Sequence, residues 1–144
     1  MGRRLQVVMD CADPARMAAF WAAALGYVEQ APPDGFDSWP EALAAMGVPE
    51  EEHGRAGAVV DPDGIGPRVF FQQVPEPKSV KNRVHLDVFV EVAADAPDEE
   101  RHAAQDAEVA RLVDLGATQV EEVLDMGFRH VVLRDPEGNE FCVA

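Results

Sequence analysis

The strongest constraint on the fold of this 144-residue chain is a duplication, because one series of sequence signals occurs twice. In each half, a helical pattern ends at a Leu-Gly pair, at Gly26 and at Gly116. An Asp-Pro-acidic-Gly turn follows, beginning at Asp61 and at Asp135, and a strand pattern comes after it. The distance from glycine to turn is 35 residues in the first half and 19 in the second, and this difference of 16 is about the size of an irregular insert at 32–54. The sequence therefore predicts two copies of one supersecondary module.

The first module, residues 1–75 with the insert 32–54, opens on the short apolar run Leu5–Cys11, which predicts a strand buried on both faces. Asp13 and Pro14 suit the N-cap and first position of a helix, and Gly26 suits its end. The apolar face expected for this helix consists of Met17, Phe20, Trp21, Ala24 and Leu25. The further elements expected are strands at Tyr27–Gln30, Ala56–Val60 and Arg68–Val74 and a short helix at Pro40–Met46.

The second module spans residues 82–144 and repeats this order, so that residues 1–144 form a single domain. Its predicted helix runs from Asp98 to Leu115, with Val109, Leu112 and Val113 on the inner face. The strands expected are Val84–Val92, Thr118–Val123, Phe128–Leu133 and Glu140–Val143. The fold class predicted is α+β.

Charge and cysteine content limit the kinds of partner and the cellular compartment that can be expected for this chain. The chain has 27 acidic and 12 basic residues, for a net charge of -15, so nucleic acids and anionic membranes are poor partners, whereas a neutral or cationic small molecule is compatible. Cys11 and Cys142 are the only cysteines, which is typical of reduced thiols, although a disulfide between them is the open alternative. With no apolar signal segment and no run of membrane-spanning length, we expect a cytoplasmic protein.

The quoted signals carry a resemblance to a known superfamily. Asp13-Pro14, Phe20-Trp21, Leu25-Gly26-Tyr27 and the turn at Asp135 resemble the vicinal oxygen chelate superfamily of glyoxalases, bleomycin-resistance proteins and ring-cleaving dioxygenases. The segment from Val74 through Asp87 resembles its glyoxalase-like domain group more narrowly. The resemblance implies two βαβββ modules whose curved mixed sheet surrounds one cavity, often with a divalent metal, and a homodimer.

The metal-ligand positions of that superfamily fall on particular residues here. They correspond to Gln6 on the opening strand and His85 on the matching strand of the second module. The third position, usually Glu, is Cys142, with Glu140 two residues earlier on the same strand face. A fourth position falls at Phe71 or Gln72. Because Cys is a soft ligand that suits Mg²⁺ or Mn²⁺ poorly, the implied set is Gln6, His85 and Glu140, and the alternative is a cavity without a cofactor.

Several of these residues admit two interpretations. His85, in a strand expected to be buried, is a metal ligand or general base, or else a hydrogen-bonded core histidine. Glu140 is a catalytic acid or base, or an edge residue that faces water. Cys142 is a soft ligand or nucleophile, or, in the interpretation we favour, a small buried hydrophobe.

Other side chains are expected near the cavity. Asp10 shares a strand face with Gln6, and Asp87 shares one with His85, so both are candidates to line it, as is Cys142. Trp39, in the insert, is expected either over the cavity mouth or packed on its own short helix. The basic residues Lys78, Lys81 and Arg83 beside His85 suit an anionic substrate group or a solvated linker.

Two functions remain open on these grounds, besides a third possibility, a degenerate domain that serves only as a dimerising or regulatory partner. The first is metal-assisted lyase, isomerase or dioxygenase-like chemistry on a small oxygenated substrate, with His85 and Glu140 as catalytic residues. The second is a non-catalytic dimer that binds a drug or metabolite, as the bleomycin-resistance branch does. The acidic charge and the missing ligand glutamate suit the second function.

Overall fold

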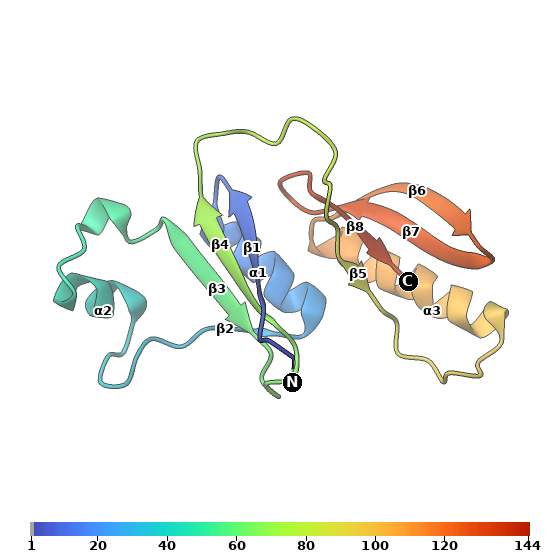
Figure 1. The fold of residues 1–144 in the computed structure, drawn as a ribbon, viewed down its shortest axis with the longest axis horizontal. Coiled ribbons are helices and arrows are strands. Elements are labelled where there is room, and N and C mark those ends of the chain that lie inside the picture. The colour runs from blue at the N-terminus through green and yellow to red at the C-terminus, as the bar shows by residue number, and fades with distance from the viewer. Residues whose placement is uncertain (1) are drawn as a thin grey trace. The chain divides into compact units, whose positions relative to one another are not determined.

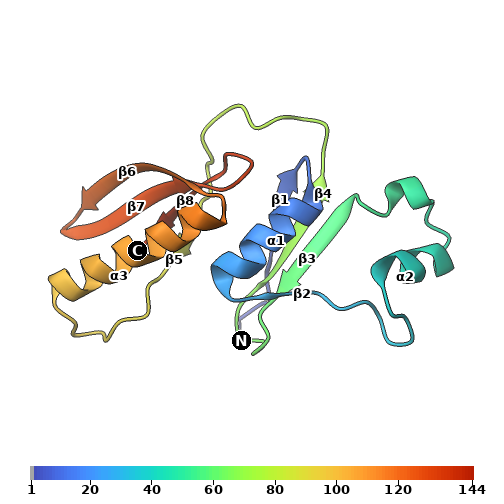
Figure 2. The same cartoon turned by 180° about the vertical axis from the view of Figure 1, so that it is seen from behind.

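A computed structural model describes residues 2–144, and the chain divides into two compact units, Met1–Pro77 and Lys78–Ala144. Each unit contains one long helix and a four-stranded mixed sheet (Figures 1 and 2). The predicted α+β fold with two βαβββ modules is confirmed. None of the helices described has the length and apolar character that a bilayer crossing demands.

The first unit is built on a sheet of order β1-β4-β3-β2, in which β1 pairs in parallel with β4 and the other pairs are antiparallel. The helix α1 covers one face of this sheet. The bounds are β1 Gln6–Cys11, α1 Pro14–Leu25, β2 Val28–Glu29, α2 Trp39–Ala45, the 3-10 helix η1 Glu50–Glu52, β3 Ala56–Val60 and β4 Arg68–Gln73.

The helix α1 begins and ends as its sequence predicts. The Asp13 side chain accepts a hydrogen bond from the backbone N–H of Arg16, and Gly26 takes a left-handed conformation at φ 68°. Four of the five residues predicted for its apolar face are buried, and Leu25 is half-buried. They pack against β3 and β4, where Val59, Val69 and Phe71 are also buried.

The second unit repeats this topology with the order β5-β8-β7-β6 and a parallel pair of β5 and β8. The bounds are β5 Asp87–Val88, α3 Asp98–Leu115, β6 Thr118–Asp125, β7 Phe128–Arg134 and β8 Glu140–Val143. On the inner face of α3, Val109 and Leu112 are buried as predicted, but Val113 is 42% exposed. It lies one residue past Leu112 and so turns about 100° away from the sheet.

The predicted strand Val84–Val92 is wrong in length, because only Asp87 and Val88 form β5. β5 lies at the edge of its sheet and pairs on one side alone, with β8. Val84 and Phe89 are 80% and 74% exposed, so the apolar run that suggested a buried strand is not covered within this unit. His85 therefore lies in an exposed irregular segment, and its expected placement in a buried strand is wrong.

The two Asp-Pro turns repeat the same hydrogen bonds. The Asp61 carboxylate accepts from the backbone N–H groups of Asp63, Ile65 and Gly66. The Asp135 carboxylate accepts from the backbone of Glu137 and from both the backbone and the side-chain amide of Asn139. Asp135 is only 3% exposed, so its oxygens depend on these donors more than the more exposed Asp61 does.

Asp135→Ala should therefore lower the free energy of unfolding by about 1–3 kcal/mol, since it leaves partly buried N–H groups without acceptors. Asp61→Ala, the matched substitution in the first unit, should cost less because water can reach its donors. Urea unfolding of the two variants measures the difference, and equal losses would contradict the role assigned to burial.

Candidate functional site

Three side chains of types that can ligate a metal meet on the open face of the second sheet, opposite α3. His85, Asp87 and Cys142 each offer one ligand atom, and these atoms lie within 4.8 Å of one another. Asp87 and Cys142 are register partners in the parallel pair of β5 and β8, so their side chains share a face. His85 precedes Asp87 by two residues, and its Nε2 lies 3.4 Å from the Asp87 carboxylate.

Burial differs within this cluster. His85 and Asp87 are about half exposed, with 47% and 45% of their side chains accessible, whereas Cys142 is 5% exposed. Burial first, and then the charge of Asp87, raise the pKa of the Cys142 thiol. The free thiol is therefore neutral near pH 7 and is a poor nucleophile by itself.

The donor set fits a borderline metal ion. One imidazole, one carboxylate and one thiol, which deprotonates on binding, are three protein ligands of the kinds that Zn²⁺ takes. Three protein ligands also leave one position of a tetrahedral ion open, as in catalytic zinc sites. The same set suits Mg²⁺ poorly because of its sulfur.

Glu140, on the same face of β8 as Cys142, is bound by neighbours of the second unit. Its carboxylate accepts a hydrogen bond of 3.0 Å from the backbone N–H of Asn82 and lies 3.2 Å from the Lys78 ammonium. The Asn82 N–H first, and Lys78 after it, lower the pKa of Glu140 to about 2. Its predicted roles as metal ligand and catalytic acid or base stay predictions, and in this state the carboxylate fastens residues 78–82 to β8.

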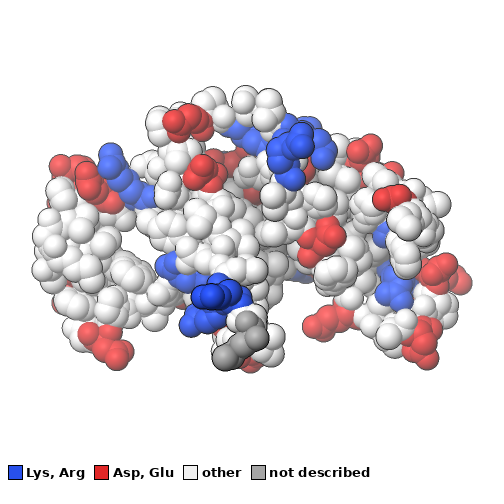
Figure 3. Space-filling model, viewed as in Figure 1, with Lys and Arg blue, Asp and Glu red and all other residues white. Residues whose placement is uncertain are grey.

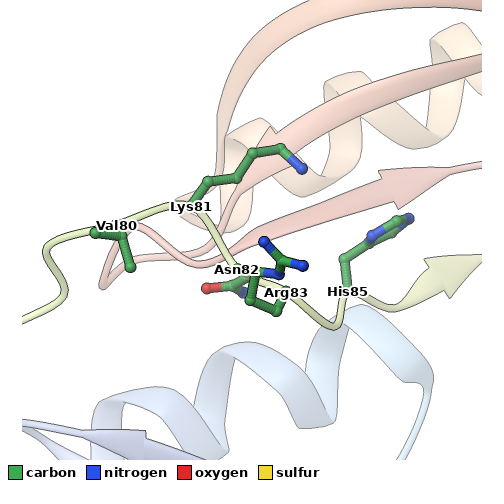
Figure 4. A pocket seen from close by; sticks show the side chains of 5 residues that line it. All are labelled: Val80, Lys81, Asn82, Arg83 and His85. Atoms are coloured by element: carbon green, nitrogen blue, oxygen red, sulfur yellow. The ribbon is translucent and has the colours of Figure 1, made fainter.

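The segment that Glu140 fastens carries the basic cluster. Val80, Lys81, Asn82, Arg83 and His85 line an open pocket of about 620 Å³. Figure 4 shows these five side chains on one stretch of chain leading into β5. Lys81 and Arg83 thus share a pocket with His85, a member of the metal-ligand cluster. Both interpretations of the basic residues, anion docking and solvated linker, stay predictions.

Gln6 belongs to the first unit and has a cation as its neighbour. Its side-chain oxygen accepts a hydrogen bond of 2.5 Å from Nη1 of Arg68, its register partner on β4. Gln6, Asp10 and Gln72 lie on the open face of this sheet, whereas Phe71 is buried on the helix face. Of the two residues considered for the fourth ligand position, Gln72 therefore shares the face of Gln6.

Sequence reasoning named Asp87 only as a lining residue and did not single out Arg68. The signal for Asp87 was its spacing of two from His85 in an extended segment, which places both on one face. Trp39 lines a pocket of the first unit together with Arg68. The predicted cavity shared by Gln6, His85 and Glu140 stays a prediction.

Comparison with solved structures shows the fold. A glyoxalase/bleomycin resistance/dioxygenase family enzyme from Burkholderia phytofirmans is 17% identical with a TM-score of 0.62, over 96% of this chain and 94% of that one. The fosfomycin resistance protein FosX of Listeria monocytogenes, in a mutant complexed with Mn(II) and 1S,2S-dihydroxypropylphosphonic acid, is 13% identical with a TM-score of 0.62, over 99% and 90%. FosX from Mesorhizobium loti is 14% identical with a TM-score of 0.61, over 99% and 90%.

No curated protein matches the chain by sequence. The family model of the glyoxalase-like domain, in contrast, matches residues 6–144, which is nearly the entire chain. The repeated βαβββ topology agrees with that match. The chain belongs to the glyoxalase-like domain family.

Proposed function

We propose that the protein binds a divalent metal of zinc type through His85, Asp87 and Cys142 and acts on a small oxygenated molecule as a lyase, isomerase or dioxygenase-like enzyme. The observation that carries the proposal is the approach of the three ligand atoms to within 4.8 Å on an open sheet face. The Mn(II) complex of FosX, a protein of the same fold, supports metal use in this superfamily. A bound metal would supply Lewis acidity toward substrate oxygens.

The side chains around the cluster suit binding of such a molecule. Lys81 and Arg83 lie next to His85 and offer donors to a carboxylate or another acidic group of the substrate. The Nε2 of His85 lies 3.4 Å from the Asp87 carboxylate, so these two ligand groups are already close to each other. The deeper position of Cys142 leaves His85 and Asp87 as the accessible side of the cluster.

The second candidate is a non-catalytic dimer that binds a drug or metabolite. One observation favours it: Glu140, the residue expected to act as acid or base, has a pKa of about 2. A general base works best with a pKa near the operating pH, so this carboxylate is a weak base while Lys78 and Asn82 hold it. Protein purified without chelator separates the two functions, since near-stoichiometric divalent metal supports the enzyme and metal-free protein that binds a cationic ligand supports the binding dimer.

Cobalt(II) titration tests the metal site, because thiolate ligation to cobalt gives a charge-transfer band in the near ultraviolet. The intact chain and Cys11→Ser should both show the band, whereas Cys142→Ser should lose it. Both cysteines are buried, so the two serine variants are matched in their expected effect on stability. A band that survives Cys142→Ser, or that the intact chain lacks, would exclude this ligand set.

His85→Ala should weaken zinc binding by more than about a hundredfold, since even residues that only orient a ligand change affinity by about 10–100-fold. His102→Ala, on α3, is the matched control and should leave the affinity unchanged. Competition with a chromophoric chelator measures both affinities. Unchanged binding in His85→Ala would remove His85 from the site.

Glu140 positions the segment that carries His85, and its substitution has a pH signature. A carboxyl pKa lowered in the folded state stabilises the fold fully above the unfolded value of 4.5, and this contribution is lost as the pH falls toward 2. Glu140→Gln should therefore lower the free energy of unfolding by about 1–2 kcal/mol at pH 7 and by less at pH 3. Urea unfolding at the two pH values, with the exposed Glu91→Gln as control, checks this; a loss independent of pH would refute it.

A further inference from the structure

A second pocket lies entirely within the first unit, between the insert helix α2 and the sheet. Its volume is about 400 Å³, and Figure 3 shows the surface hollowed between the insert and the body of the unit. The pocket forms because β2 is short: Val28 and Glu29 pair with Val60 and Val59, which leaves the edge of β3 at Ala56 uncovered. Apolar lining comes from Ala15, Ala18, Trp39, Leu43, Ala58 and Phe70.

Arg68 provides a fixed cation in the wall of this pocket. Its Nε donates to the Gln30 side-chain oxygen at 2.7 Å, and its Nη1 donates to Gln6. The guanidinium carbon lies 5.0 Å from the centre of the Phe70 ring. Two amide oxygens and a ring face therefore hold the guanidinium in place, and Nη2 has no partner among the described residues.

The charge of Arg68 is not neutralised by a carboxylate of the described chain, in contrast to the charges of Arg111 and Arg129. Arg129 pairs with Asp106 and Glu122, and Arg111 pairs with Glu108. Two glutamates also line the pocket, but Glu52 pairs with Arg55, and Glu29 is the register partner of Val59 and so faces the helix side of the sheet. A half-buried cation with neutral partners favours an anion supplied from outside.

Trp39 contributes apolar ring surface in a fixed orientation. Its indole N–H donates to the backbone oxygen of Gln30 at 2.7 Å, which satisfies the polar group of the ring. The same Gln30 holds Arg68 through its side chain and bonds β3 through its backbone N–H to Ala58. One residue thus sets the positions of the aromatic wall and of the cation together.

We propose that this pocket binds a small planar carboxylate. Nη2 of Arg68 donates to the carboxylate, and the rings of Trp39 and Phe70 contact the flat apolar part of the ligand. The site lies in the first unit and does not depend on the metal cluster of the second. It adds an anionic ligand to a chain whose net charge favours neutral or cationic partners, because Arg68 places a positive charge at the point of contact and salt screens the acidic residues that lie more than a Debye length away.

The test uses the full chain after chelator treatment, so that failure of the metal site has no effect on the result. Benzoate, neutral benzamide and cationic benzylamine are titrated, with binding followed by calorimetry and by the fluorescence of the partly exposed Trp39. Benzoate should bind about tenfold or more tightly than benzamide, and benzylamine should bind least. Equal binding of benzoate and benzamide, or no binding of benzoate at millimolar concentration, would overturn the proposal.

Variants assign the binding to Arg68. Arg68→Gln should weaken benzoate binding about ten- to hundredfold, the range for a lost charge-assisted hydrogen bond. Arg111→Gln removes the same charge from a half-exposed side chain of the second unit that does not line the pocket, and it should leave the affinity unchanged. Ala58→Leu fills the pocket while keeping the charge, and should abolish binding with circular dichroism unchanged. Unaltered benzoate binding in either Arg68→Gln or Ala58→Leu would refute the site.

Discussion

The parallel pairing of the first and last strands within each unit is the constraint on which the other features depend. Because β1 joins β4 and β5 joins β8, the sheet order repeats, and the crossover places one helix on one face of each sheet. The other face stays free of the helix, and strand alternation decides which side chains reach it. Gln6 meets Arg68 through the register of β1 and β4, and Asp87 meets Cys142 through that of β5 and β8. Both proposed sites therefore follow from the same pairing in its two copies.

Elements with local signals were predictable from the sequence, and elements defined by distant partners were not. α1 has its cap at Asp13 and its stop at Gly26, and α3 was predicted close to its observed bounds, since propensity, end signals and apolar spacing act over a few residues. The strand predicted at Val84–Val92 was wrong in length. Apolar composition cannot reveal that β5 is an edge strand with one neighbour, β8. The prediction that Val113 lies on the inner face of α3 was wrong for a related reason, since the sheet covers only a narrow stripe of this helix.

The candidate sites divide in the same way. The family resemblance pointed to His85 and to the position of Cys142, and alternation added Asp87, because these relations are short in sequence or shared by relatives. Arg68 was missed since its two amide partners, Gln6 and Gln30, lie 62 and 38 residues away. The binding of Glu140 by Lys78 and Asn82 spans 62 and 58 residues and was equally invisible. The chemistry of a charged group depends on its partners. When those partners are distant in the chain, no periodic sequence pattern indicates them.

The hydrogen bond between Gln6 and Arg68 has a thermodynamic corollary. A ligand that turns the side chain of Gln6 toward itself takes this amide oxygen away from Nη1 of Arg68 and leaves the guanidinium with only its hydrogen bond to Gln30. By thermodynamic linkage, a ligand bound at Gln6 and an anion bound at Arg68 then change each other's affinity by the same factor, whichever binds first. A module of this size can thus couple the binding of two small ligands through one shared hydrogen-bond acceptor, with no change of fold.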